Sequence, residues 1–151
     1  MTIRPPAARP HASSGAVFFD ERGHLLLVDP VYKPYWNLVG GAIDAGETPR
    51  SACAREVHEE LGVRFPIGDL LVSAWLTFPD RQHFYFVFDG ATLTSADIDA
   101  IRLDPAELGA KRFVTADAAR VLVPPWLVPV IDAVLDARST GGQRYLELDG
   151  R

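Results

Sequence analysis

Three glutamates near the middle of the chain, Glu56, Glu59 and Glu60, constrain its structure and chemistry more than any other feature. Each residue of a helix turns by about 100°, so this i, i+3, i+4 spacing places the three carboxylates on one face. Like charges at those spacings repel each other and destabilise a helix. A solvated helix face is the plain interpretation of such a pattern. The flanking residues favour a site for a divalent cation, which binds oxygen ligands.

Those flanking residues predict a glycine-rich loop followed by a helix. Thr48 suits the N-cap, and Pro49 suits the first helical position, where a missing N–H costs nothing. Gly62 stands where a left-handed C-cap glycine belongs. Before the helix, Gly40–Gly41 and Gly46 allow the backbone angles of a tight loop that approaches a ligand. An apolar stripe beside the carboxylates lets one helix face pack on a sheet while its neighbour lines a cavity. The stripe comprises Cys53, Ala54, Val57 and Leu61.

This segment resembles the Nudix box, G-x5-E-x7-R-E-U-x-E-E-x-G-U, where U is a bulky aliphatic residue. Every specified position is filled, and the lead-in from Trp36 to Gly41 also resembles that of the family, although Val39 stands where the family often has proline. The residues that match the box are Gly41, Glu47, Arg55, Glu56, Val57, Glu59, Glu60, Gly62 and Val63.

The resemblance implies an α/β fold, the Nudix-type α/β/α sandwich with a mixed central sheet. It also implies Mg²⁺ or Mn²⁺ held by Glu56, Glu59 and Glu60, with the carbonyl of Gly40 as a further ligand. Arg55 and Glu47 would pair and orient the carboxylates, since a guanidinium binds a carboxylate through two parallel hydrogen bonds. Replacing Glu59 by Gln is then expected to abolish nearly all activity.

The general base stays open at this stage. Glu107 precedes an expected strand at about the position where relatives carry an additional carboxylate, but an exposed loop residue is an equal interpretation. Glu56 is the other candidate, because it serves as the base in some members of the family.

The implied reaction is hydrolysis of a phosphoanhydride bond in a nucleoside diphosphate linked to another moiety. Nucleoside triphosphates, ADP-ribose and nucleotide sugars all remain open as substrates. Trp36, Tyr35 and Phe84 are candidates to stack on a base, and Lys33 and Arg81 to contact phosphates, although such residues often serve the core or the surface. The alternative is a non-catalytic Nudix-fold module for ligand sensing or interaction. Degenerate modules are expected to lose box carboxylates, and this box is intact.

The whole chain suits a single domain. Its 151 residues suffice for one core, so we expect an N-terminal flexible arm over residues 1–12 and one domain over residues 13–151. The formal charge of −5 makes nucleic acid an unfavourable partner and requires a metal between the carboxylates and an anionic substrate. Apolar runs are too short for a membrane span, and one cysteine suits a reducing compartment, so we expect a cytoplasmic protein. A homodimer remains open.

Strands are expected over residues 14–19, 24–28, 67–78, 82–88, 111–114 and 145–148. Besides the box helix, we expect a helical turn over residues 97–101 capped by Ser95, a short helix over residues 115–120 and a C-terminal helix over residues 128–138. Cys53 is expected to be a buried thiol, and His83 to lie at the surface, with a contact to substrate as the alternative.

Overall fold

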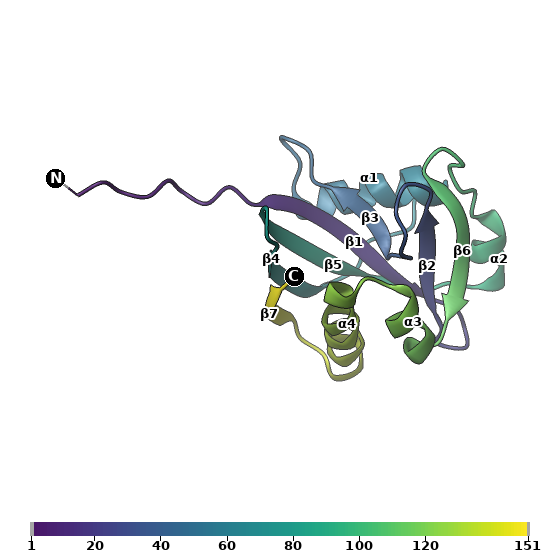
Figure 1. Ribbon diagram of the computed structural model, residues 1–151. Coiled ribbons are helices and arrows are strands. Elements are labelled where there is room, and N and C mark those ends of the chain that lie inside the picture. Colours follow the sequence, from purple (N-terminus) through teal and green to yellow (C-terminus); the bar gives the residue numbers. More distant parts are fainter. Residues whose placement is uncertain (1, 151) are drawn as a thin grey trace.

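The computed structural model describes residues 2–150, which form one mixed sheet with helices on both faces (Figure 1). The strands are β1 (His11–Phe19), β2 (Leu25–Pro30), β3 (Val39–Ala42), β4 (Leu70–Thr77), β5 (Gln82–Thr92), β6 (Leu108–Val114) and β7 (Arg144–Asp149). The helices are α1 (Pro49–Leu61), α2 (Ser95–Ala100), α3 (Ala116–Leu122) and α4 (Val128–Thr140), with a short 3-10 helix, η1 (Pro125–Leu127), before α4.

The sheet has the strand order β6-β2-β1-β5-β4-β7, and β3 pairs with β1 beside this path. The pairs β1–β5 and β4–β7 are parallel, whereas the other pairs are antiparallel. Helix α1 packs on β1 and β3 on one face, and α4 packs on β4 on the other (Figure 1). Each face carries its own buried apolar cluster. The expected α/β/α sandwich with a mixed central sheet is therefore confirmed.

Alternating side chains of β5 explain why both faces of the sheet are covered. Tyr85 and Val87 belong to the cluster beneath α4, whereas Phe88 belongs to the cluster beneath α1. Successive residues of a strand point to opposite faces, so one strand supplies both cores. Burial of these apolar side chains, at about 25 cal/mol per Å² removed from water, is the main term that holds the layers together.

Several boundaries differ from those expected. Strand β1 begins at His11, three residues before the expected start, and residues 2–10 contain no helix or strand and extend away from the sheet (Figure 1). The flexibility of that segment and the domain limits stay predictions. Helix α2 is capped by Thr94, not Ser95, because the Thr94 side chain accepts from the Asp97 backbone N–H. Within the described residues, no helix is long and apolar enough to cross a bilayer.

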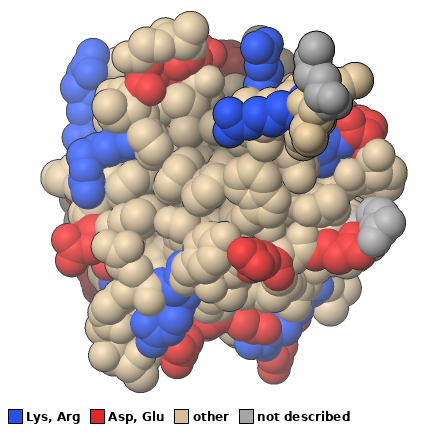
Figure 2. Space-filling model, turned by 90° about the vertical axis from the view of Figure 1, so that its left-hand side faces the viewer, with Lys and Arg blue, Asp and Glu red and all other residues tan. Residues whose placement is uncertain are grey.

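Figure 2 looks at the end of the molecule from which the N-terminal segment leaves. Positive and negative residues are interspersed around the rim of this face, and uncharged residues occupy its middle. A nucleic-acid backbone is bound mainly by clustered lysines and arginines. This face therefore does not present one continuous basic surface.

Candidate active site

Helix α1 begins and ends as its sequence predicts. The Thr48 side chain accepts from the Ser51 backbone N–H, and the Ser51 side chain accepts from the Thr48 N–H, which makes a reciprocal capping box. Gly62 ends the helix with φ +73°, in the left-handed region. These caps place the carboxylates of the last two turns at the edge of β3.

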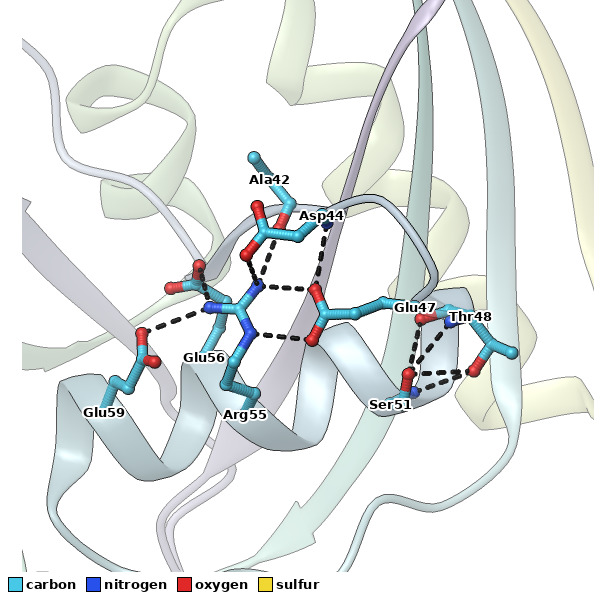
Figure 3. Close-up of polar contacts among 8 residues, drawn as sticks. All are labelled: Ala42, Asp44, Glu47, Thr48, Ser51, Arg55, Glu56 and Glu59. Atoms are coloured by element: carbon cyan, nitrogen blue, oxygen red, sulfur yellow. Dashed lines mark hydrogen bonds and ion pairs between the residues drawn. The ribbon is translucent and has the colours of Figure 1, made fainter.

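Arg55 connects the helix to the loop before it, as Figure 3 shows. Its Nε and Nη2 donate to the two carboxylate oxygens of Glu47 at 2.7 and 2.8 Å. Nη1 donates to Glu56 at 2.9 Å and to Glu59 at 3.2 Å, and Nη2 also donates to the carbonyl of Ala42 at 3.0 Å. All the N–H groups of the guanidinium are thus used. Hydrogen bonding to Arg55 holds the pKa of Glu47 down at about 2. The structure thus gives Arg55 and Glu47 the geometry that their proposed positioning role requires.

Strand β3 has glycines where α1 comes closest. A Cβ at Gly41 would lie 2.5 Å from the Glu56 carboxylate, so a side chain there would displace it. Gly40 has φ +151° and donates its N–H to Oε2 of Glu60 at 3.3 Å. The missing side chains let the α1 carboxylates reach past the strand. The structure places Gly40 at the cavity, while its carbonyl as a ligand stays a prediction.

Three carboxylates meet at this edge. Ligand oxygens of Glu56, Glu60 and Glu107 all lie within 4.8 Å of one another. Glu107 comes from the loop before β6, and its backbone carbonyl accepts from the N–H of Val31 at 3.0 Å. The structure therefore joins Glu107, whose role the sequence left open, to two glutamates of the box. It places Glu59 outside this group, with its side chain 48% exposed and hydrogen-bonded to Arg55.

The electrostatics of the cluster suit a divalent cation. Burial raises the pKa of Glu60 to about 8, and repulsion from Glu56 and Glu107 adds to the rise. The hydrogen bond from Gly40 opposes it. Burial likewise raises the pKa of Glu56, although Arg55 opposes the rise. Glu60 is only 6% exposed, and the Gly40 N–H is a weak substitute for a neutralising charge. Hard oxygen donors with excess negative charge are the ligand set that Mg²⁺ and Mn²⁺ bind.

The acidic cluster opens into a cavity of about 490 Å³. Glu60, Glu107 and the glycines of β3 line one part, with Lys33 nearby, and Arg81 lines another. The two cations expected to contact phosphates therefore both face the cavity. Lys33 also lies over the ring of Tyr32, 5.4 Å from its centre.

The three aromatic residues expected to stack on a base lie elsewhere, and Tyr35 is exposed. Phe84 is on the opposite face of β5, where it stacks on Phe86 at 4.6 Å and meets Trp75 edge-on. Trp36 packs against the core beneath α4, with Arg112 over its ring. None of the three lines the cavity. Strand alternation explains the position of Phe84, because its neighbours in sequence point the other way. Contacts of these residues with a substrate stay predictions.

Apart from His83, for which a contact with substrate was the alternative, the aromatic residues that line the cavity were missed. Phe78 follows β4, His83 and Tyr85 lie on β5, Trp126 lies in η1, and Tyr32 lies in the loop after β2. His83 was expected at the surface, but it is partly buried and faces the cavity. Alternation along β5 would have placed His83 and Tyr85 on one face, whereas no local signal marks Trp126. Cys53 is a buried thiol, as expected, and its burial raises its pKa to about 12.

An α/β sandwich with a carboxylate-bearing helix beside a cavity defines a class of protein that can hold a divalent cation and an anionic ligand. Comparison with known proteins identifies the family. The NUDIX domain model matches residues 9–135. The chain belongs to the Nudix family, in agreement with the expectation from the box.

Sequence relatives include an RNA pyrophosphohydrolase from Rhodospirillum rubrum, 29% identical, with 89% of this chain and 93% of the relative covered. Diphosphoinositol polyphosphate phosphohydrolase 2 from Rattus norvegicus is 36% identical over 65% of this chain, but the match spans only 53% of that protein. Pyrophosphohydrolase relatives and the complete box support an enzyme over the non-catalytic module.

Solved structures share the fold. The MutT protein from Methanosarcina mazei Go1 superposes with a TM-score of 0.74 at 20% identity, covering 90% of this chain and 99% of that one. An Ap4A hydrolase from C. elegans gives a TM-score of 0.69 at 18% identity, covering 85% and 98%. The relatives differ in the substrates that their names state, so the family does not specify the substrate of this chain.

Proposed function

We propose that this protein is a Mg²⁺- or Mn²⁺-dependent enzyme that hydrolyses a phosphoanhydride bond in a nucleoside diphosphate linked to another moiety. The observation that carries the proposal is the convergence of Glu56, Glu60 and Glu107 within 4.8 Å at the mouth of the cavity. Nucleoside triphosphates, ADP-ribose and nucleotide sugars are the candidate substrates. The Nudix relatives named above support this class of reaction.

The three carboxylates would hold the cation, which supplies charge withdrawal from the phosphates and acidification of a water when bound. Arg55 holds Glu56 in place from behind, and the Gly40 N–H does the same for Glu60. Lys33 neutralises charge on the phosphates, because it lines the cavity close enough to Glu60 to affect that carboxyl group. Glu107 and Glu56 remain the candidates for the base that takes a proton from water.

A substrate panel tests the proposal. The purified protein is incubated with Mg²⁺, Mn²⁺ or chelator and with ADP-ribose, nucleotide sugars, dinucleoside polyphosphates and nucleoside triphosphates. Products are separated by chromatography and released phosphate is measured with and without added phosphatase. We expect metal-dependent hydrolysis of one compound far above the others. Hydrolysis that survives chelation, or none across the panel by folded protein, contradicts the proposal.

A further inference from the structure

The two ends of the cavity differ in chemistry. Carboxylates and glycine backbone form the acidic end, which also includes the single ring of Tyr32. The rings of Phe78, His83, Tyr85 and Trp126 form the aromatic end. Trp126 meets Phe78 and Tyr85 nearly edge-on, with ring centres 6.0 and 5.9 Å apart. Rings packed edge to face hold one another in position. The aromatic end is therefore a preformed surface for a flat, apolar group.

Tyr85 joins the two ends. Its ring contacts Trp126, and its hydroxyl lies 3.1 Å from the position that a Cβ on Gly15 would occupy, next to the Val39 carbonyl that precedes Gly40. On the same sheet face, Ser13 is paired with Tyr85 on one side and with Ala42 on the other. A ligand with phosphates at the acidic end can thus reach the rings with its other end.

The small number of positive charges in the cavity lining favours a ligand with few phosphates. Among the described residues that line the cavity, the lysines and arginines are Lys33 and Arg81. Arg81 already lies 4.5 Å above the ring of Phe78 and pairs with Asp80 at 3.0 Å. A molecule with phosphates all around it would leave most of them against rings and carboxylates, where an unpaired charge is costly. A short phosphate chain attached to a flat group suits this lining better.

One polar pair interrupts the aromatic end. Ser13 Oγ and His83 Nε2 are 2.7 Å apart. Burial, with Arg81 and His11 nearby, lowers the pKa of His83 to about 4, so the imidazole is neutral at pH 7 and carries one N–H. Within the described part of the chain, His83 Nδ1 is buried without a hydrogen-bond partner.

The position of that one proton determines what Ser13 can do. Buried N–H groups without an acceptor are rare, so we assign the proton to Nε2, where it is donated to Ser13 Oγ. The Ser13 oxygen then acts as acceptor, and its O–H has no second partner among the residues that the structure describes. Since Ser13 lines the cavity, this O–H is available as a donor to a ligand.

We propose that the aromatic end binds the base of a nucleotide, and that Ser13, oriented by His83, donates a hydrogen bond to an acceptor on that base. The inference rests on the proposed function, which assigns the phosphates to the acidic end. It names the substrate class as a nucleotide with its base bound beside Trp126, and it assigns Ser13 as a specificity residue and His83 as its positioning residue.

Binding by calorimetry tests the proposal without requiring turnover. Wild-type protein with Mg²⁺ is titrated with ADP, GDP, CDP, UDP and inorganic pyrophosphate. We expect at least one nucleoside diphosphate to bind more than about 10-fold tighter than pyrophosphate, because bases gain from stacking on aromatic rings. Ser13→Ala should weaken that nucleotide about 3–10-fold and leave pyrophosphate unchanged, since one hydrogen bond is lost. Ser73→Ala, on the opposite face of the sheet next to Trp75, is the matched control.

The role of His83 is tested through Ser13. His83→Gln retains an N–H near the position of Nε2 and should preserve base binding, whereas His83→Leu should weaken it as much as Ser13→Ala does. Combining His83→Leu with Ser13→Ala should add little, because both changes remove one interaction. Additive losses contradict the assignment of His83 as a positioning residue.

Two results overturn the base assignment. One is equal affinity for pyrophosphate and every nucleoside diphosphate, and the other is a Ser13→Ala effect that is the same for pyrophosphate. Hydrolysis of base-free polyphosphates as efficiently as of nucleotides would also contradict it, while leaving the metal-dependent hydrolysis of a phosphoanhydride bond intact. Base-dependent binding without hydrolysis of any compound would instead contradict the proposed function and support the base site.

Discussion

At the scale of the residue, the structure separates the roles of glutamates that the sequence grouped together. Glu60 is buried, accepts from the Gly40 N–H and lies in the acidic cluster. Glu59, one residue earlier, is half exposed and bonds to Arg55. Under the proposed function, a carboxylate in the cluster would bind the cation directly, whereas one paired with Arg55 would act by orienting the others.

Glu60→Gln should therefore reduce kcat/KM by more than about 100-fold, since even partners of metal ligands typically cost about 10–100-fold. Glu59→Gln should cost clearly less, because the Glu59 carboxylate lies outside the cluster and is paired with Arg55. The role of Glu59 as a metal ligand stays a prediction. Steady-state kinetics with the best substrate of the panel measure both losses. Glu21→Gln, at an exposed glutamate on the turn after β1, is the control. An equal loss for the two box variants would support Glu59 as a metal ligand, as expected from the sequence.

Arg55→Lys should lower kcat about 10–100-fold with little change in the melting temperature. A lysine keeps the charge but cannot reproduce two parallel hydrogen bonds to Glu47 together with those to Glu56 and Glu59. Kinetics and thermal unfolding are measured side by side. Arg64→Lys, at an exposed arginine after α1, serves as the control. Wild-type kcat in Arg55→Lys would show that charge alone suffices.

At the scale of the element, β3 determines how the acidic helix meets the cavity. The strand is short, pairs with β1, and carries the glycines that leave space for Glu56 and Glu60. The position of the α1 carboxylates therefore depends on the absence of side chains at these two positions of β3.

Gly41→Ala should weaken metal binding and lower activity by at least about 10-fold, because the new methyl group would lie 2.5 Å from the Glu56 carboxylate. Calorimetric titration with Mn²⁺ and steady-state kinetics measure the two effects. Gly109→Ala is a matched control, since a Cβ there meets its nearest neighbour at 3.7 Å. Unchanged Mn²⁺ affinity in Gly41→Ala would contradict the close approach.

The sequence predicted the elements that carry capping residues or a clear pattern of apolar side chains. It did not predict the elements that lack both. The box helix, its caps and the strands around residues 14–19, 82–88 and 145–148 follow from capping chemistry and side-chain patterns. Strand β3 was missed because only Val39 in its Val-Gly-Gly-Ala sequence favours a strand, and the strand is held by pairing to β1.

The same distinction applies to the site. The box residues lie within one short segment, so their spacing was sufficient to predict them. Trp126, Tyr85 and Ser13 meet only after the strands pair, which no local pattern encodes. Phe84, on the face of β5 opposite the cavity, shows that an aromatic strand predicts a core more reliably than it predicts which face lines a cavity.

At the scale of the whole molecule, the acidic cluster links pH, metal and stability. The folded pKa of Glu60, about 8, lies above its ordinary value of 4.5. The folded state therefore binds more protons than the unfolded state between these values, and stability decreases as pH rises through this window. A bound cation favours the ionised carboxylates and opposes the decrease.

Metal-free protein should thus melt at a lower temperature at pH 8 than at pH 5.5, and Glu60→Gln should reduce that difference. Mg²⁺ or Mn²⁺ should raise the melting temperature most at the higher pH, and binding should release protons at pH 7. Thermal scans across pH, and calorimetry in buffers of different ionisation enthalpy, measure these effects. If the melting temperature of Glu60→Gln depends on pH as strongly as that of the wild type, the pH dependence must come from other titratable groups.

The acidic end of the cavity comes mainly from one stretch between Gly40 and Glu60, whereas the aromatic end is assembled from β1, β4, β5 and the segment around Trp126. Changes to the second set of residues can therefore alter which molecule is accepted without disturbing the bond-breaking residues. The two ends of the cavity can thus evolve separately: the acidic end can be retained while the residues of the aromatic end are exchanged. Redesign of this protein toward a new substrate should begin at the aromatic end of the cavity.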